Sequence, residues 1–219
     1  MTFVGSKTNL CFSWLNIELM LMSLRTVIFS LLCLAIETLF LPAVLGDDQN
    51  ENSAEMPGDD TVTLDTLFAE LEKATSLAEA QSVERVIWAT WHWHKIPRLS
   101  QKLRLGTMYL QENNFKKALY IFDNIIKEAP AFSEAYNKRA TTYFLMKKYE
   151  KSLMDIKTTL ALEPRHFGAL SGMGLIFMNR GDFQRALVAF TAVLKIYPFS
   201  ISARANMKII ERELNLKVL

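Results

Sequence analysis

The amino-acid sequence predicts an all-α protein made of helical hairpins that stack into a solenoid. The first indication is a period: three of the 6 prolines stand at positions 130, 164 and 198, which are 34 residues apart. The second is that small, aromatic and large apolar residues recur with the same period. The third is the composition, because 50% of the 219 residues are apolar and only 8 are glycine, which excludes collagen-like and low-complexity chains. A fixed period in this range is typical of repeat architectures.

Charge is distributed unevenly along the chain. Residues 1–46 contain four charged side chains, residues 47–60 contain six acids and no base, and residues 61–219 contain 23 Lys and Arg against 15 Asp and Glu. The C-terminal part is moderately basic, which favours acidic partners but falls short of a nucleic-acid-binding composition, so we expect no nucleic-acid partner. Cys11 and Cys33 both lie in the first 46 residues. The rest of the chain therefore offers no cysteine for a disulfide, a nucleophile or a metal site.

The N-terminal segment has the order of features found in secretory signal peptides. Arg25 precedes an apolar run over residues 26–41, and Val44 and Gly46 then stand at the −3 and −1 spacing that a signal peptidase accepts. Cleavage there would make Asp47 the first residue of the mature chain.

Residues 1–46 are therefore predicted to be a signal peptide, with an uncleaved membrane anchor as the alternative. A start at Met22 would make the signal peptide one of ordinary length, and the sequence leaves open whether translation begins at Met1 or Met22. Residues 26–45 are about long enough to span a bilayer. Both readings predict export, either to a bacterial periplasm or to an anchored position in the inner membrane facing it.

Residues 47–61 are predicted to be an acidic disordered linker. This stretch is rich in Asp and Glu, contains one Pro-Gly pair at 57–58 and shows no hydrophobic periodicity. It would hold the folded part of the chain away from the membrane or the cleavage site.

Residues 62–98 are predicted to be an N-terminal helical pair, with helices over 64–74 and 76–94. When the repeat frame is moved back by 34 residues, the small positions of the period are not filled by small residues. The pair is therefore a degenerate repeat or a helical cap, and we expect Trp88 and Trp91 to cover the first repeat.

Three repeat units follow, over 99–132, 133–166 and 167–200. A small residue at the eighth position of each unit would let a second helix approach closely, and an aromatic residue three places later would fill the space beside that contact. Each unit is thus predicted to be two antiparallel helices, closed by a proline that cannot continue a helix. The columns, in the order of the units, are Gly106, Ala140 and Gly174; Tyr109, Tyr143 and Phe177; Phe115, Tyr149 and Phe183; Ala118, Ser152 and Ala186; and Phe122, Ile156 and Phe190.

This pattern resembles the tetratricopeptide repeat (TPR) family, and the resemblance covers residues 99–200, nearly half of the chain. Three features depart from the family pattern. In the second unit Arg139 replaces the usual leucine, and Thr159 replaces a small or apolar residue. The first signature position does not carry the usual tryptophan. That position is Lys102, Tyr136 and Leu170 in the three units.

Residues 201–219 resemble the C-terminal capping helix that covers the exposed face of a last repeat. Ile209, Ile210 and Leu214 are apolar there, with charged residues between them. The predicted architecture is therefore an all-α, TPR-like helical-hairpin solenoid with an N-terminal helical pair and a C-terminal capping helix.

The resemblance implies that the first helix of each unit lines a concave groove that binds a peptide or protein segment. Chaperone-binding members of the family clamp a terminal carboxylate there with Lys, Asn and Arg, whereas the equivalent residues here are mostly Leu, Thr, Ser and Gly. We therefore expect no such clamp and a groove of mixed apolar and hydroxyl character. An alternative is that the C-terminal helix or the linker fills this groove. The predicted groove residues are Leu103, Thr107, Leu110, Asn137, Thr141, Phe144, Ser171, Leu175 and Met178.

The function predicted from these features is a non-enzymatic protein–protein interaction or assembly module, with no catalytic residue, metal or cofactor. The sequence contains no nucleophile elbow, no glycine-rich phosphate loop and no paired carboxylates at useful spacing. One alternative is a metal-dependent or enzymatic accessory that uses His92 and His94. Residues two apart on a helix point in different directions, so we expect these histidines to pack rather than to share a ligand. Another alternative is a structural adaptor that forms homo-oligomers through its end helices.

Overall fold

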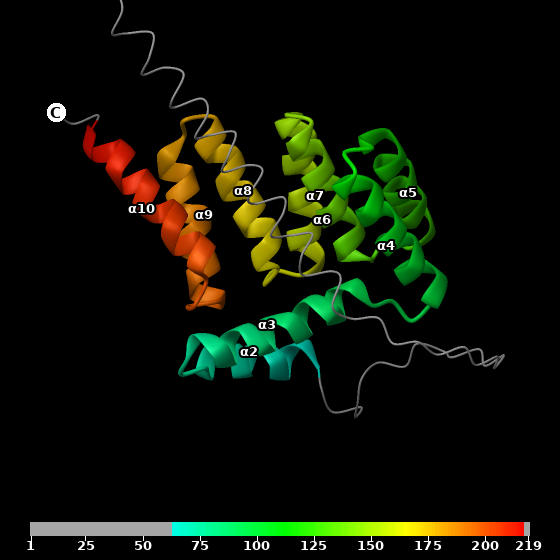
Figure 1. Ribbon diagram of the computed structural model, residues 1–219, viewed down its shortest axis with the longest axis horizontal. Coiled ribbons are helices and arrows are strands. Elements are labelled where there is room, and N and C mark those ends of the chain that lie inside the picture. The colour runs from blue at the N-terminus through cyan, green and yellow to red at the C-terminus, as the bar shows by residue number, and fades with distance from the viewer. Residues whose placement is uncertain (1–62, 217–219) are drawn as a thin grey trace, which may run out of the picture. The chain divides into compact units, whose positions relative to one another are not determined.

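The computed structural model describes residues 63–216, and this part of the chain is all-helical, as predicted (Figure 1). It contains nine helices and no strand between those two residues. The predicted leader, 1–46, and the predicted linker, 47–61, lie outside the described residues. The helices are α2 (Leu64–Lys73), α3 (Leu77–His92), α4 (Pro97–Gln111), α5 (Phe115–Glu128), α6 (Ser133–Leu145), α7 (Tyr149–Leu162), α8 (Phe167–Asn179), α9 (Phe183–Ile196) and α10 (Ile201–Leu216).

None of the helices within 63–216 combines the length and the apolar composition needed to cross a lipid bilayer.

Six of the helices form three antiparallel hairpins, α4–α5, α6–α7 and α8–α9, which lie side by side (Figure 1). The turns occupy the same place in each hairpin, at Asn113, Lys147 and Gly181, whose φ angles are 58°, 57° and 70°. This left-handed conformation suits Gly and Asn far better than Lys. In the first and third hairpins the next side chain, Asn114 or Asp182, then caps the second helix by accepting a hydrogen bond from a backbone N–H three residues on.

In the first and third hairpins the two helices meet where a glycine faces a phenylalanine. A Cβ atom built on Gly106 would lie 2.5 Å from the ring of Phe122, and one built on Gly174 would lie 2.7 Å from the ring of Phe190. Both rings are fully buried. The small residue of the repeat therefore accommodates this ring.

The middle hairpin differs from its neighbours in two ways. Ala140 carries a Cβ where they have glycine, and the facing column holds the smaller Ile156, with both side chains buried in one cluster. Beside them Arg139 takes the place of a leucine. Its guanidinium donates to both oxygens of Asp155 on α7, at 2.8 and 2.6 Å, and to Asp123 on α5 at 2.6 Å. An ion-pair network thus replaces an apolar contact at this position.

The pair α2–α3 does not cover the first repeat, so that prediction was wrong. Helix α3 runs across the ends of α6 and α8 (Figure 1). The indole of Trp91 stacks on the ring of His166 with centroids 3.9 Å apart, and Trp88 meets Phe167 edge to face at 5.5 Å. Two adjacent aromatic rings, His166 and Phe167, provide this surface where the second unit meets the third. The equivalent positions 98 and 99, where the first unit begins, are Arg and Leu.

One hydrophobic cluster joins this pair to the third hairpin and to α10. Trp91 lies in it, and on α10 Ala203 and Ile210 are fully buried against α9. A hydrogen bond adds to the contact, because the Tyr197 hydroxyl after α9 donates to the Glu84 carboxylate on α3 at 2.8 Å. The two ends of the described chain are therefore packed into the same core.

Candidate binding groove

Five of the nine predicted groove residues line one cavity of about 260 Å³ between α6 and α8. They are Asn137, Thr141, Phe144, Ser171 and Leu175. The other four residues lie outside this cavity. Thr107 is half-buried on α4, and Met178 is half-buried near the end of α8, where it packs against the third-unit core.

The prediction that Leu103 and Leu110 are exposed in the groove was wrong. Leu103 is fully buried and Leu110 is 7% exposed. Both belong to the core of the first hairpin, together with Phe132 and Ala135 at the start of the next unit. Because α6 packs over this side of α4, these two leucines contribute to stability and are not available to a partner.

All twelve residues that line the cavity are uncharged. The seven that were not in the predicted groove set come from the floor and the edges. Ser152 and Ile156 on α7 show that the second helix of a hairpin reaches the cavity through the gap left by small residues on the first. These seven residues are Ala140, Leu145, Ser152, Ile156, Gly168, Ala169 and Gly172.

The hydroxyls at the cavity wall donate within the protein, and so does one of the two amide hydrogens of Asn137. The hydroxyl of Thr141 donates to the Asn137 carbonyl at 2.9 Å, and that of Ser171 donates to the Phe167 carbonyl at 2.8 Å. The side-chain amide of Asn137 donates to Glu134 at 2.9 Å. Their oxygens remain able to accept hydrogen bonds. The wall is therefore mostly apolar, with oxygens that can accept hydrogen bonds and one remaining N–H of Asn137 that can donate.

Beside this wall a buried carboxylate, Glu134, joins α3, α6 and α8. Its side chain is 0% exposed; Oε2 accepts a hydrogen bond from His166 Nε2 at 2.9 Å, and Oε1 lies 3.1 Å from Lys138 Nζ and 3.4 Å from His92 Nε2. Burial alone would raise the pKa of Glu134. The hydrogen bond from His166 and the charge of Lys138 outweigh burial, so the pKa of Glu134 is lower than its ordinary value.

The two rings near Glu134 are fixed by other hydrogen bonds. His166 Nδ1 accepts from the backbone N–H of Ala169 at 3.2 Å, which caps α8, so its Nε2 carries the proton that bonds Glu134. His92 Nδ1 lies 2.6 Å from the Trp88 carbonyl. The sequence analysis did not connect either histidine with Glu134, because residues 92, 134 and 166 are far apart in the chain.

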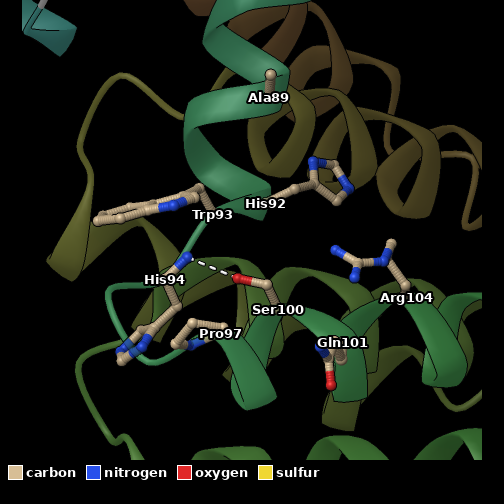
Figure 2. Close-up of a pocket in the computed structure, with 8 residues that line it drawn as sticks. All are labelled: Ala89, His92, Trp93, His94, Pro97, Ser100, Gln101 and Arg104. Atoms are coloured by element: carbon tan, nitrogen blue, oxygen red, sulfur yellow. Dashed lines mark hydrogen bonds between the residues drawn. The ribbon is translucent and has the colours of Figure 1, made fainter. Parts of the chain in front are cut away.

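His92 and His94 do not form a shared site. Figure 2 shows their rings pointing to different sides of a small cavity of about 170 Å³ between the end of α3 and the start of α4. The backbone N–H of His94 donates to Ser100 at 2.8 Å, and its ring lies 4.9 Å from the ring of Phe132. His92 and His166 face different oxygens of the Glu134 carboxylate and do not point toward one shared metal position. Within residues 63–216 no three His, Cys, Asp or Glu side chains are placed to hold a metal ion.

The Glu134 contacts predict a loss of stability in acid. Because the pKa of Glu134 is lower in the folded protein than the unfolded value of about 4.5, its stabilisation is complete above that pH and is lost as the pH falls through the folded value. At pH 7 we expect Glu134→Gln to lower the free energy of unfolding by about 1–3 kcal/mol, because Lys138 loses its carboxylate partner. Urea unfolding at pH 7 and pH 3 should show that the difference between variant and wild type shrinks in acid.

The exposed carboxylate of Glu128 gives the matched control. It also has a lowered pKa, caused by hydrogen bonds from Lys102 and Arg98. Solvent screens this pair, so Glu128→Gln should lose less stability than Glu134→Gln. An equal loss in the two variants, or no loss in Glu134→Gln, would contradict the role assigned to the buried carboxylate.

Stacked helical hairpins of this kind define a helical repeat protein. The comparisons with known proteins agree on the class. The tetratricopeptide repeat family model matches residues 169–200. A TPR repeat-containing protein of Rhizobium etli is 34% identical over 151 residues, which cover 69% of this chain and 74% of that protein. The chain belongs to the family of TPR repeat-containing proteins.

More distant relatives share only the repeat region. The small glutamine-rich tetratricopeptide repeat-containing protein 2 of Saccharomyces cerevisiae is 24% identical over 91 residues, 42% of this chain and 26% of that protein. Among solved structures, the first TPR of Spaghetti (RPAP3) bound to the HSP90 peptide SRMEEVD has a TM-score of 0.51 at 20% identity, covering 53% of this chain and 93% of that one. The Sgt2 TPR domain of Aspergillus fumigatus has a TM-score of 0.51 at 19% identity, covering 54% and 80%. These two likenesses describe the fold.

Proposed function

We propose that this chain is a non-enzymatic protein-interaction module that binds a segment of a partner protein in the groove between α6 and α8. One observation carries the proposal: a cavity of about 260 Å³ is lined by twelve uncharged residues, five of them predicted from the repeat pattern. A cavity on a folded domain that is mostly apolar and carries a few polar atoms is the usual form of a binding site. The groove wall offers no chemistry beyond binding.

A solved relative of the same fold supports the proposal as a precedent. The first TPR of Spaghetti (RPAP3) is bound to a peptide of HSP90. TPR proteins typically act as scaffolds rather than as enzymes, in line with a groove that holds no catalytic group. The chemistry of the partner that this chain binds follows from the residues that line this chain's cavity.

The proposal predicts that one cavity substitution abolishes peptide binding. Peptides selected from a random display library on the full chain should bind Leu145→Asp at least tenfold more weakly, because a carboxylate would then stand at an apolar wall that otherwise carries acceptors. Leu145 lines the cavity and is 48% exposed, so the substitution leaves the core intact. Isothermal titration calorimetry measures the affinities.

Met154→Asp is the matched control. Met154 is 70% exposed on α7 and lies outside the cavity, so this variant should bind the selected peptides like the wild type. Peptides that bind both variants with unchanged affinity, or a library from which the full chain selects nothing, would contradict the proposed function.

Export is a second part of the proposal, and it rests on the sequence of residues 1–46. We propose that the chain is exported and that the groove operates in the periplasm, with the chain cleaved before Asp47 or anchored in the inner membrane. Self-association through the end helices stays a prediction.

A further inference from the structure

Two glycines of α8, Gly172 and Gly174, differ in how far packing requires the absence of a side chain. Gly174 has no side chain because the ring of Phe190 occupies that space, with ring atoms 2.7 to 2.9 Å from where its Cβ would be. Gly172, two residues earlier, has no such neighbour. A Cβ atom built on it would meet only Ile156 Cδ1, at an ordinary contact distance of 3.6 Å.

Gly172 therefore leaves open space where packing does not require it. It lies within a helix, where glycine is less stable than alanine. Its missing side chain enlarges the cavity that Phe144, Ile156 and Leu175 line. Neither packing inside the chain nor helix stability accounts for a glycine at this position, whereas room for an incoming group does.

The wall chemistry determines what that group is. A carboxylate entering the cavity would leave water for a wall that has no charged residue, and would face the oxygens of Thr141 and Ser171 after their hydroxyl hydrogens have been used elsewhere. An ammonium group would find no carboxylate among the lining residues. An uncharged apolar side chain fits the lining, and the backbone N–H groups beside it can donate to the free oxygens.

The size of the cavity agrees with one side chain. An apolar cavity of about 150 Å³ holds a benzene molecule. The space here is about 260 Å³, which is enough for one leucine, methionine or phenylalanine side chain and part of its backbone.

We propose that the groove recognises its partner through one uncharged apolar side chain, which occupies the space over Gly172 and excludes acidic and basic side chains. This inference rests on the proposed function, and it makes Gly172 the residue that determines specificity. The partner segment would therefore insert one apolar side chain, and its backbone N–H groups would donate to the free oxygens of the cavity wall.

The test uses the full chain labelled with ¹⁵N-glycine, because the chain contains only 8 glycines and its spectrum is correspondingly simple. The probes are N-acetyl-leucinamide and N-acetyl-methioninamide, with the α-amides of N-acetyl-glutamate and N-acetyl-lysine for comparison. We expect the two apolar probes to shift the Gly168 and Gly172 signals saturably, with dissociation constants in the millimolar range. The charged probes should bind at least tenfold more weakly. Gly181 has no atom near its Cβ position and serves as the internal reference.

Gly172→Leu fills the cavity and should abolish the Gly168 shift, while Ala161→Leu, at an exposed position of α7, should leave it unchanged. Thermal unfolding checks the fold, and Gly172→Ala should melt no lower than the wild type, whereas Gly174→Ala should melt lower. No saturable shift with the apolar probes, equal binding of the glutamate probe, or an unchanged shift in Gly172→Leu would overturn the inference.

The same variant separates this inference from the proposed function. Peptides that bind the groove but tolerate Gly172→Leu, or that share an acidic anchor, would leave the proposed function standing and overturn the inference. A chain that selects no peptide but still binds the apolar probes would overturn the proposed function and leave only a site for an apolar side chain over Gly172.

Discussion

Replacing Arg139 by leucine, the residue that the family pattern favours at this position, is expected to lower the free energy of unfolding by about 3–5 kcal/mol. Asp155 is 5% exposed, and its two oxygens accept hydrogen bonds from the guanidinium. These hydrogen bonds, and a third to Asp123, raise the pKa of Arg139 above its ordinary value, although burial opposes them. Leucine would leave a buried carboxylate without its partner. Urea unfolding at pH 7 measures the loss.

A double variant separates the buried charge from the packing. Arg139→Leu combined with Asp155→Ala removes both charges, and we expect it to regain much of the stability lost in the single variant. Asp123 is the control, because its side chain is 55% exposed and its pairing with Arg139 is screened by solvent. Asp123→Asn should change the stability by less than about 1 kcal/mol. A single Arg139→Leu variant as stable as the wild type would show that the network is not needed.

Phe190→Ala is expected to lower the free energy of unfolding by about 3–5 kcal/mol, and Phe122→Ala by a similar amount. Both rings are 0% exposed, and each lies directly over a glycine of the facing helix. Each substitution leaves a cavity, and the glycine beneath the ring has no side chain to fill it. Chemical unfolding followed by circular dichroism measures the loss, and Val188→Ala, at a position on α9 that is 71% exposed, is the control.

The middle hairpin suggests how the stability lost by enlarging Gly174 can be regained. Gly174→Ala alone should overpack against Phe190 and cost about 1–3 kcal/mol. Gly174→Ala with Phe190→Ile reproduces the combination found naturally at Ala140 and Ile156, so the two losses should not add. Additive losses in this double-mutant cycle would contradict the direct contact between the two positions.

The sequence by itself determined the hairpins and much of their packing. The 34-residue period locates the units, and the columns that hold Gly106 and Gly174 identify where the helices approach most closely. Such contacts are local, because the two helices of a hairpin are joined by a short turn. Their residue types therefore carry the information. Five of the twelve residues that line the cavity were predictable because each occupies a fixed position in its unit.

The tertiary structure alone decided which repeat positions are covered. Leu110 and Phe144 occupy equivalent positions of their units, yet the first is buried beneath the following unit and the second lines an open cavity. Only the neighbours of each helix distinguish them. The role of Gly172 likewise depends on the lack of a side chain packed closely against it. The repeat pattern carries no information about that contact.

The position of α3 was also a matter of tertiary structure. Trp91 packs on His166, and His92 reaches Glu134, across separations that no period relates. In the sequence these are isolated aromatic and charged residues. They become one buried contact only because the stacking of the hairpins brings the starts of α6 and α8 to the same edge, where α3 lies across them.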